Sequence, residues 1–396
     1  MAATETPMGI LQVVEACGAG VGRHVSGLCG DLASRGHRVT VAYSPHRMDA
    51  AFERFLDEQR GGIHFFPMNI GRRVSPASDA RGLLRLLRLI KRGGPFDIVH
   101  GHSSKGGALG RVAGKLSGVP TVYTPNSVIM ASPNLSKGAS AFYTLVERLL
   151  GRLATSRFIA VAEDERDFAV CLKLIPEDRT SVIGNAVAEE YFEDFSKEPP
   201  YESVHERPLT FGSAIRFSEQ KAPDDMVEAF IRMSRKLPGI PARLMIAGDG
   251  ELFEKVKKRA EESGMGERIS LPGWMPDAKA LLRETDVFVI SSLYEGLSFS
   301  TIEAMAAKKP VVSTDVFGTR ETICRVPGNV LVPVGDVDAL ARGMERMATL
   351  SKPETLRRSL MEVGLENHEY ARERFRQSHV TSRTIEVYRS LCERRD

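Results

Sequence analysis

The sequence predicts an α/β protein with two doubly wound, parallel-sheet domains, and its patterning and length support this fold class. Short apolar runs that suit buried strands alternate with helix-like segments along the whole chain. Several runs are apolar at consecutive positions, which is typical of parallel strands covered on both faces. A length of 396 residues is long for one hydrophobic core and fits two domains.

Composition and charge exclude several classes of protein. The formal net charge is only +3, so bulk charge gives no argument for nucleic-acid binding. The five cysteines are scattered without a C-x-x-C pair, which fits a reducing cytosol and predicts no zinc site. The first residues have no signal-peptide pattern, and no apolar run approaches the ~20 residues of a membrane span. We therefore expect a cytoplasmic protein.

The first predicted domain covers residues 1–188. Its first strand, Ile10 to Val14, is followed by a glycine-rich turn that contains Gly20 and by a helix. The glycines let the backbone approach a ligand closely, or they only make a tight turn. The turn is not G-x-G-x-x-G, and the next strand, Arg38 to Tyr43, does not end in an acid for a dinucleotide ribose. An NAD oxidoreductase is therefore disfavoured.

A basic helix and two strands with polar ends continue this domain. Residues 80–92 form an apolar helix with interleaved arginines and lysines, which either lies on an anionic membrane surface or packs with a solvated basic face. We favour the packed helix. The strand 96–102 ends in His102, which is either a substrate contact or a structural histidine. The strand at 120–124 is followed by Asn126.

An acidic, proline-containing segment, residues 189–208, is predicted to link this domain to a second one at residues 209–369. After the strand at 209–215 come Arg216 and Lys221, which are either anion ligands or surface cations. A final amphipathic helix within residues 370–396 is expected to return to the first domain.

Three further features of the second domain bear on a ligand site. Asp249 lies in a glycine-rich turn after a strand, and Trp274 follows another strand and is either a ligand neighbour or a packing residue. Asp336 and Asp338 form a D-x-D that could hold a metal. They directly precede a helix, where acids cap and favour the first turn, so we predict capping and no metal.

The second domain is organised around the stretch from Asp286 to Ala306. Residues 287–290 are a fully apolar strand, 291–296 a turn, and a helix begins near Ser300. Glu295 should therefore lie in the loop after a strand and Glu303 about one turn into the next helix. Ligands bind at the carboxyl ends of parallel strands, and a helix N-terminus there suits a phosphate.

The spacing of Glu295 and Glu303 in this context, followed by Lys309-Pro310-Val311-Val312, resembles the core of glycosyltransferase family 4, the retaining GT-B enzymes. The short sequence motifs around Arg216, Lys221 and Asp249 resemble those of the same family. The resemblance covers essentially the whole chain and is strongest at residues 209–338. It implies two Rossmann-like domains that face an interdomain cleft.

The resemblance also implies roles for individual residues. Glu303 would bind the ribose hydroxyls of a nucleotide, and Glu295 would hold sugar hydroxyls and stabilise the electron-poor anomeric carbon. Arg216 and Lys221 would stabilise the departing diphosphate without a metal. The remaining donor contacts would come from Gly20, Asp249, Trp274 and the stretch Leu297, Ser298 and Phe299. No cofactor is implied, because the nucleotide sugar is a substrate.

Three positions depart from the family pattern, and one of them is Ala186, which follows Asn185 where the family more often has Asn-Gly. Asn126 stands where the family usually has a histidine near the transferred sugar, and Asn can orient a hydroxyl but cannot titrate. Ala222 stands where glycine is usual. His102 and Asn126 are nevertheless expected to contact the sugar or the acceptor, and the irregular segment 129–137 is a candidate acceptor loop.

The predicted function is transfer of a hexose from a nucleoside diphosphate sugar, with UDP favoured and GDP next, to an acceptor hydroxyl with retention of configuration. Bacterial surface or exopolysaccharide synthesis is the expected setting. A lipid-linked saccharide would be the acceptor, at the inner face of the membrane, with the protein bound there peripherally. A GT-B epimerase or phosphorylase and a non-catalytic nucleotide-sugar-binding protein are the alternatives.

Overall fold

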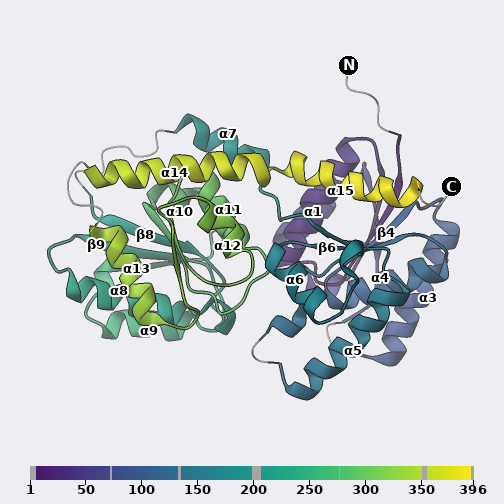
Figure 1. The fold of residues 1–396 in the computed structure, drawn as a ribbon, viewed down its shortest axis with the longest axis horizontal. Coiled ribbons are helices and arrows are strands. Elements are labelled where there is room, and N and C mark those ends of the chain that lie inside the picture. The colour runs from purple at the N-terminus through teal and green to yellow at the C-terminus, as the bar shows by residue number, and fades with distance from the viewer. Residues whose placement is uncertain are drawn as a thin grey trace. The chain divides into compact units, whose positions relative to one another are not determined.

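The computed structural model describes residues 6–71, 74–132, 135–198, 207–275, 277–349 and 355–393, with the side chains of 355–359 left out. The chain divides into two compact units, which are described separately (Figure 1). Unit 1 comprises residues 1–186 and 377–396, and unit 2 comprises residues 187–376. Both have a parallel sheet between helices, so the predicted α/β fold class is confirmed.

Unit 1 contains a sheet of seven parallel strands in the order β3-β2-β1-β4-β5-β6-β7. The strands are β1 (Gly9–Val14), β2 (Arg38–Tyr43), β3 (Ile63–Pro67), β4 (Ile98–His102), β5 (Thr121–Thr124), β6 (Arg157–Ala160) and β7 (Thr180–Val182). The α-helices are α1 (Ala19–Ser34), α2 (Ala50–Glu58), α3 (Pro76–Arg92), α4 (Ser104–Leu116), α5 (Lys137–Leu153), α6 (Glu163–Cys171) and α15 (Gln377–Cys392). The 3-10 helices are η1 (Pro45–Arg47), η2 (Ile129–Ala131) and η3 (Glu177–Arg179).

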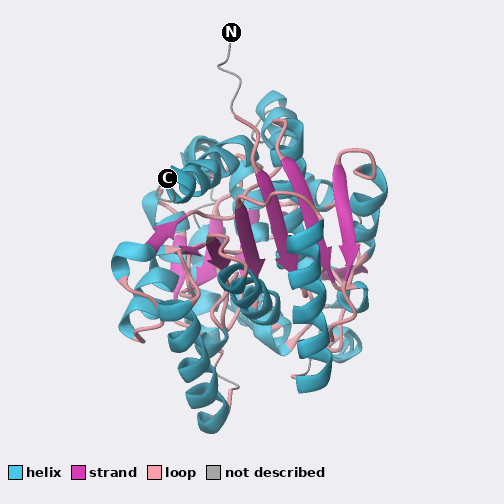
Figure 2. Cartoon of the chain, turned by 90° about the vertical axis from the view of Figure 1, so that its right-hand side faces the viewer, coloured by secondary structure: helices cyan, strands magenta, loops and turns pink. Residues whose placement is uncertain are grey.

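The side chains of β1 pack into two hydrophobic cores of unit 1, one on each face of the sheet, because successive side chains of a strand point to opposite faces. Ile10 and Val14 belong to the core that includes residues of α1, α2 and α15. Leu11 and Val13 belong to the core that includes residues of α3 and α4. Figure 2 shows the strands of this unit with helices in front and behind. Burial on both faces explains why the strand is apolar at consecutive positions.

Unit 2 contains a sheet of six parallel strands in the order β10-β9-β8-β11-β12-β13. The strands are β8 (Leu209–Ala214), β9 (Ala242–Ala247), β10 (Ile269–Gly273), β11 (Val287–Ile290), β12 (Val311–Thr314) and β13 (Val330–Val332). The α-helices are α7 (Glu189–Lys197), α8 (Pro223–Lys236), α9 (Phe253–Glu262), α10 (Ala278–Glu284), α11 (Phe299–Ala306), α12 (Thr319–Thr322), α13 (Val337–Thr349) and α14 (Thr355–Arg374). The 3-10 helices are η4 (Glu219–Lys221), η5 (Gly266–Arg268) and η6 (Ile323–Arg325).

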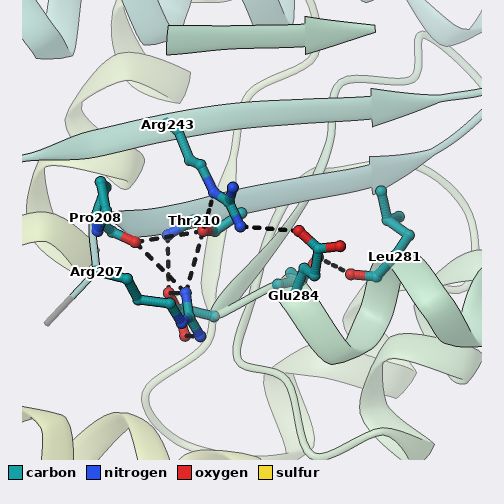
Figure 3. A network of polar contacts seen from close by, with 8 residues as sticks. Arg207, Pro208, Thr210, Arg243, Leu281 and Glu284 are labelled. Atoms are coloured by element: carbon teal, nitrogen blue, oxygen red, sulfur yellow. Dashed lines mark hydrogen bonds and ion pairs between the residues drawn. The ribbon is translucent and has the colours of Figure 1, made fainter. Parts of the chain in front are cut away.

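A polar network ties β8, β9 and β11 together at the amino end of β8 (Figure 3). Arg207 donates to both carboxylate oxygens of Asp286, at 2.8 and 2.7 Å, and the amide of Thr210 donates to the same carboxylate at 2.8 Å. Arg243 bridges the Thr210 hydroxyl, at 2.8 Å, and the Glu284 carboxylate, at 3.0 Å. Ion pairs with several hydrogen bonds hold their geometry well. This network fixes the sheet from the edge opposite to the predicted ligand edge.

The predicted linker, residues 189–208, is wrong in its first half. Residues 189–197 form α7, which belongs to unit 2 and buries Phe192 and Phe195. Lys279 pairs with Asp194 at 2.7 Å and fastens α7 to α10. The many acids of this segment concealed the two apolar positions on its inner face. Residues 199–206 of the predicted linker lie outside the described residues.

The single C-terminal helix predicted from residue 370 is also wrong, because two helices occupy this region. Helix α14 ends at Arg374 in unit 2, and α15 starts at Gln377 in unit 1. Between them Phe375 leaves the helical path, and its carbonyl accepts a hydrogen bond from the amide of Val187 at 2.7 Å. The two chain segments that lead from one unit to the other therefore run side by side, so the second boundary lies at residue 376 rather than 369.

The predicted D-x-D acts as a helix cap. The carboxylate of Asp336 accepts from the amide of Ala339 at 2.8 Å, and Asp338 pairs with Arg232 at 2.5 Å. Among the helices that the structure describes, none combines the length and apolarity that crossing a bilayer requires.

Candidate active site

The strand order of unit 2 reverses between β8 and β11, and the predicted catalytic residues follow these two strands. Lys221 lies in η4, after β8, and Glu295 lies in the loop after β11. The Lys221 ammonium donates to the Glu295 carboxylate in a short ion pair. A switch point of this kind is where open parallel sheets bind their ligands. The structure therefore brings together two residues that the sequence predicted separately.

The main chains of the two loops are also joined. Ser291 donates through its hydroxyl to the carbonyls of Lys221, at 2.8 Å, and Ala222, at 2.9 Å. The Gln220 amide group donates to the carbonyl of Tyr294 at 2.9 Å. These bonds hold the backbone of Lys221 in place, so little reorganisation is needed when a charged ligand arrives.

Glu295 is almost fully enclosed, with 8% of its surface exposed. Its Oε1 accepts both from Lys221 and from the Ser292 hydroxyl, the latter at 2.7 Å. Lys221 retains 19% side-chain exposure. An ammonium has three N–H donors, so Lys221 can hold Glu295 and still donate to a ligand oxygen.

Glu303 lies on α11 and is 2% exposed. Helix α11 begins directly after the Glu295 loop, and Ser298 caps it by accepting from the amide of Thr301 at 3.4 Å. Gly318 packs closely against buried Leu297. Its φ is +78°, and an added Cβ would lie 2.7 Å from a methyl carbon of Leu297. Gly318 must therefore be glycine, both for its conformation and for its contact. The result is a fixed helix N-terminus beside two enclosed carboxylates.

Arg216, Asp249 and Trp274 lie in the adjoining loops after β8, β9 and β10 and are exposed, Trp274 at 61%. Their loops are bonded to each other, because the amide of Phe217 donates to the Asp249 carbonyl at 2.9 Å and that of Gly248 to the Gly273 carbonyl at 2.8 Å. No hydrogen bond or ion pair between their side chains and Lys221 or Glu295 is present in the described part of unit 2. All three residues lie at the predicted edge, but only Lys221 and Glu295 are joined directly.

The strand order of unit 1 reverses between β1 and β4. Gly20 lies in the helix that follows β1, and His102 is the last residue of β4. Gly20 is exposed in the first turn of α1, where the neighbouring amide of Ala19 donates to Asp49 at 2.8 Å. His102, the last residue of β4, is fully buried rather than open at the strand end. The sequence could place His102 along the strand but could not show what covers it.

His102 belongs to a buried cluster with His24 and His100. The rings of His100 and His102 have centroids 4.1 Å apart, and those of His24 and His102 are 5.4 Å apart. His100 bonds to the hydroxyl of Tyr388 on α15 at 2.7 Å, and Gln12 donates to the same hydroxyl at 3.2 Å. This cluster was not predicted from the sequence. The contact with Tyr388 was the hardest part to predict, because 288 positions separate it from His100.

The histidines of this cluster are held neutral. Burial lowers the pKa of His24 to about 4, and it lowers the pKa values of His100 and His102 well below their ordinary range. The amide oxygen of Gln12 faces Nε2 of His102 at 2.7 Å, so Nε2 carries the proton and donates. Nδ1 of His102 is left as a buried acceptor without a partner among the described residues. The cluster thus contains a neutral, buried hydrogen-bond acceptor rather than a positive charge.

The ends of β4 and β5 contain strained backbone. Ser103, Asn126 and Ser127 have φ values of 55°, 57° and 112°. The Ser103 hydroxyl and the Asn126 side-chain oxygen are buried and have no partner within the described ranges. Left-handed conformations of such residues cost about 1–3 kcal/mol each and often occur at functional sites. The strained backbone and these two oxygen atoms therefore mark the ends of β4 and β5 as part of the candidate site.

Glu165, in the first turn of α6, holds this strained turn and was not singled out from the sequence. Its carboxylate accepts from the amides of Ser127 at 2.9 Å and Val161 at 2.8 Å. Burial raises the pKa of Glu165 to about 7, although these amides favour the ionised form. An acidic residue in a first helical turn is common at the surface, so its position in the sequence does not indicate that Glu165 faces inward.

Family models match both halves of the chain. The model described as "Glycosyl transferase 4-like domain" matches residues 19–186, and that described as "Glycosyl transferases group 1" matches residues 194–362. Unit 1 and unit 2 correspond closely to these two matches.

Similar proteins agree with the family models. The UDP-Gal:alpha-D-GlcNAc-diphosphoundecaprenol alpha-1,3-galactosyltransferase of Escherichia coli is 29% identical over 293 residues, which cover 72% of this chain and 74% of that one. A glycosyltransferase of Rickettsia africae has the same fold with a TM-score of 0.77 at 20% identity, over 98% of this chain and 99% of that one. HepE of Anabaena, solved in complex with UDP, has a TM-score of 0.76 at 17% identity, over 97% and 100% of the two chains. Together with the paired family models, these likenesses show that the chain belongs to glycosyltransferase family 4 and has the GT-B fold.

Proposed function

We propose that this glycosyltransferase moves a hexose from a nucleoside diphosphate sugar to an acceptor hydroxyl and retains the anomeric configuration. The observation that carries the proposal is the Lys221–Glu295 ion pair at the switch point of unit 2, directly before the helix that bears Glu303. The cation and the helix N-terminus suit a diphosphate, and the two enclosed carboxylates suit the hydroxyls of a sugar and a ribose.

The donor would be held by residues of unit 2. Glu303 accepts from the two ribose hydroxyls, and Glu295 accepts from sugar hydroxyls beside the anomeric carbon. Lys221 and Arg216 donate to the diphosphate, with the amides at residues 297–299 completing its site. Exposed Arg216 gains a partner in this arrangement. Asp249, Trp274 and, from unit 1, Gly20 would neighbour the base and phosphates.

The chemical step would break the bond between the anomeric carbon and the phosphate oxygen. The acceptor oxygen attacks from the same face, and its proton passes to the departing diphosphate oxygen. Lys221 and Arg216 stabilise the charge that develops on the diphosphate, and Glu295 stabilises the electron-poor carbon. This step needs neither a metal nor a separate general base. His102 and Asn126 would orient hydroxyls of the sugar or of the acceptor, and neutral His102 suits that role.

UDP is the favoured nucleotide and GDP the next. The E. coli relative is named for a UDP-galactose donor and a diphosphoundecaprenol-linked acceptor, and HepE was solved with UDP. A lipid-linked saccharide is accordingly the acceptor we propose, in bacterial surface or exopolysaccharide synthesis, with the protein bound peripherally at the cytoplasmic face of the membrane.

Product analysis with a panel of donors tests this proposal. Purified protein is incubated with UDP-, GDP- and ADP-hexoses, with and without undecaprenyl-diphosphate-linked N-acetylglucosamine. We expect one nucleotide to be released only when the acceptor is present, and an α-linked product from an α-linked donor by NMR. A β-linked product would contradict retention. Epimerisation or phosphorolysis of the donor without acceptor would instead establish the GT-B epimerase or phosphorylase alternative.

A further inference from the structure

The side chain of Tyr388, on α15, reaches the histidine cluster of unit 1. It is fully buried, and its ring meets that of His100 edge-on, with centroids 5.8 Å apart. Its hydroxyl lies 2.7 Å from Nδ1 of His100 and 3.2 Å from Nε2 of Gln12. One hydroxyl from the last helix of the chain therefore joins side chains of β1 and β4, the two strands between which the strand order reverses.

These contacts belong to one continuous row of hydrogen bonds, which we call the Tyr388 row. At one end, the side-chain oxygen of Gln12 lies 2.7 Å from Nε2 of His102. At the other end, Nε2 of His100 lies 2.8 Å from the hydroxyl of Thr124 on β5. The row consists of His102, Gln12, Tyr388, His100 and Thr124, each at most 1% exposed. Because water does not reach these side chains, the pairing of donors with acceptors decides where the protons lie.

The orientation of the Gln12 amide decides which nitrogen of His102 carries the proton. With its oxygen toward His102, Gln12 accepts from Nε2–H, and its amide nitrogen donates to the Tyr388 hydroxyl. The hydroxyl then gives its own proton to Nδ1 of His100, whose Nε2–H donates to Thr124. With the amide turned round, Gln12 would donate to Nε2, and the proton of His102 would lie on Nδ1.

The turned arrangement is the less favourable of the two. Nδ1 of His102 is buried and has no hydrogen-bond partner within the part of the chain that the structure describes. A proton on Nδ1 would make a buried N–H donor without an acceptor, which costs the full desolvation of that group. Tyr388, by accepting from the amide nitrogen of Gln12, therefore stabilises the tautomer that leaves Nδ1 as an acceptor.

A hydroxyl group is the ligand that suits this acceptor. His102 ends β4, and the residues just beyond the ends of β4 and β5, Ser103 and Asn126, are half-buried. The other members of the Tyr388 row are enclosed, so a ligand approaches His102 from the side of Ser103 and Asn126. A neutral, unprotonated Nδ1 accepts from a hydroxyl, whereas it has no proton to offer to a phosphate or carbonyl oxygen.

We propose that Gln12 and Tyr388 are positioning residues that keep Nδ1 of His102 unprotonated, so that it accepts a hydrogen bond from a hydroxyl of the transferred sugar or of the acceptor. Both act through His102. The proposal rests on the proposed function in one respect, because it takes His102 as the residue that contacts this hydroxyl. It also gives α15 a part in the site, beyond its packing in the core that includes residues of α1.

Long-range proton–nitrogen NMR of the histidine rings tests the tautomer directly, without donor or acceptor. Spectra of the full chain at neutral pH are compared for wild type and Tyr388→Phe, and His102→Gln assigns the resonances. The control is Tyr370→Phe, which removes a hydroxyl that donates to the Glu321 carbonyl at 2.6 Å in unit 2. Thermal midpoints establish that the variants fold.

We expect His102 of wild type and of the control to carry its proton on Nε2. In Tyr388→Phe, the Gln12 amide loses the hydroxyl that selects its orientation. One orientation then leaves an amide N–H without an acceptor, and the other leaves Nδ1–H of His102 without one, so both tautomers should be populated.

Kinetics with the preferred donor and acceptor test whether the two residues act through His102. Tyr388→Phe should lower kcat/KM about three- to tenfold, and Gln12→Leu, which removes the same selection, should lower it by as much. In a His102→Ala background neither change should lower it further, because the side chain through which they act is absent. Tyr370→Phe should turn over as wild type does.

A wild-type His102 protonated on Nδ1, or a single unchanged tautomer in Tyr388→Phe, would overturn the proposal. Losses for Tyr388→Phe and His102→Ala that add in full would overturn it as well. Failure of wild type to transfer sugar from any donor would count against the proposed function. The NMR spectra are recorded without substrate, so they would still confirm or overturn the control of the tautomer by Gln12 and Tyr388.

Discussion

The ammonium of Lys221 contacts the carboxylate of Glu295 although 74 positions of sequence separate the two residues. The contact spans the loops after β8 and β11, which are neighbouring strands at the point where the strand order reverses. Both side chains are largely enclosed, at 19% and 9% exposure, so the pair is screened less by solvent than a surface ion pair. The proposed chemistry depends on this one contact more than on any other.

Replacing Lys221 by alanine should lower kcat/KM for the donor by about 10²–10³-fold, because a preorganised cation that stabilises the departing diphosphate is lost. Steady-state kinetics with the preferred donor measure the effect. Lys236→Ala is the control, since Lys236 is 64% exposed and pairs with Glu345 on the surface of the same unit. Equal rates for Lys221→Ala and wild type would remove Lys221 from the mechanism.

Glu295→Gln should reduce kcat by about 10²–10³-fold while leaving the dissociation constant for the free nucleoside diphosphate unchanged. Glutamine keeps the size of the side chain and an oxygen for Ser292, but it loses the charge that faces the anomeric carbon. Kinetics and calorimetry together separate the two quantities. Glu284→Gln, at the opposite edge of the sheet, is the matched control. A variant that turns over normally would show that Glu295 is only structural.

The thermal stability of the protein should fall as the pH is lowered below about 6.5, because the buried histidine cluster stays neutral in the folded state. The pKa of His24 is lowered from 6.5 to about 4, so between these values the unfolded chain binds the proton and the folded chain does not. Each such histidine lowers the free energy of unfolding by about 1.4 kcal/mol per pH unit.

Glu165 acts in the opposite direction. Its pKa is raised from 4.5 to about 7, so its contribution to stability grows as the pH falls through that window. His100 and His102 act with His24, so the net slope follows the histidines. Unfolding midpoints of wild type and His24→Gln measure the slope, with exposed His64→Gln as control. A wild-type midpoint that stays constant or rises on acidification would contradict the neutral cluster.

Gly248→Ala should destabilise the protein by more than about 2 kcal/mol and weaken donor binding. Gly248 has a φ of +139°, and an added Cβ would lie 1.8 Å from the carbonyl oxygen of Ile215 in the loop that leads to Lys221. Gly239→Ala is the control, because a Cβ there meets nothing within 4 Å. Unfolding midpoints and nucleotide titrations of both variants provide the measurement. A neutral Gly248→Ala would mean that the turn is not fixed by this contact.

The sequence predicted the strands of this fold well because apolar runs are local signals. The segments 38–43 and 287–290 begin and end as predicted. The segment 189–197 was missed because its acids concealed the buried Phe192 and Phe195. The break at Phe375 was missed because it is made by a hydrogen bond to Val187, far away in the sequence.

For the candidate site too, the sequence predicted local features and missed contacts between distant residues. Sequence motifs located four residues of the site: Glu295, Glu303, Arg216 and Lys221. Only the folded chain shows that Lys221 contacts Glu295 and that Arg216 is exposed. His102 was placed at a strand end, yet its neutral tautomer depends on Gln12, which contacts it from another strand. Residue patterns indicate local structure along the chain. The burial of a side chain and its contacts with distant residues depend on the order of the strands in the sheet.

Titration calorimetry of UDP, GDP and ADP into wild type and Glu303→Gln tests the central claim that this edge of unit 2 is the nucleotide-sugar site. We predict that one nucleotide, with UDP favoured, binds wild type and binds Glu303→Gln about 10–100-fold more weakly, because charge-assisted hydrogen bonds to the ribose are lost. The control Glu284→Gln should bind as wild type does. Binding that is equal in wild type and Glu303→Gln, or absent for all three nucleotides, would contradict the account.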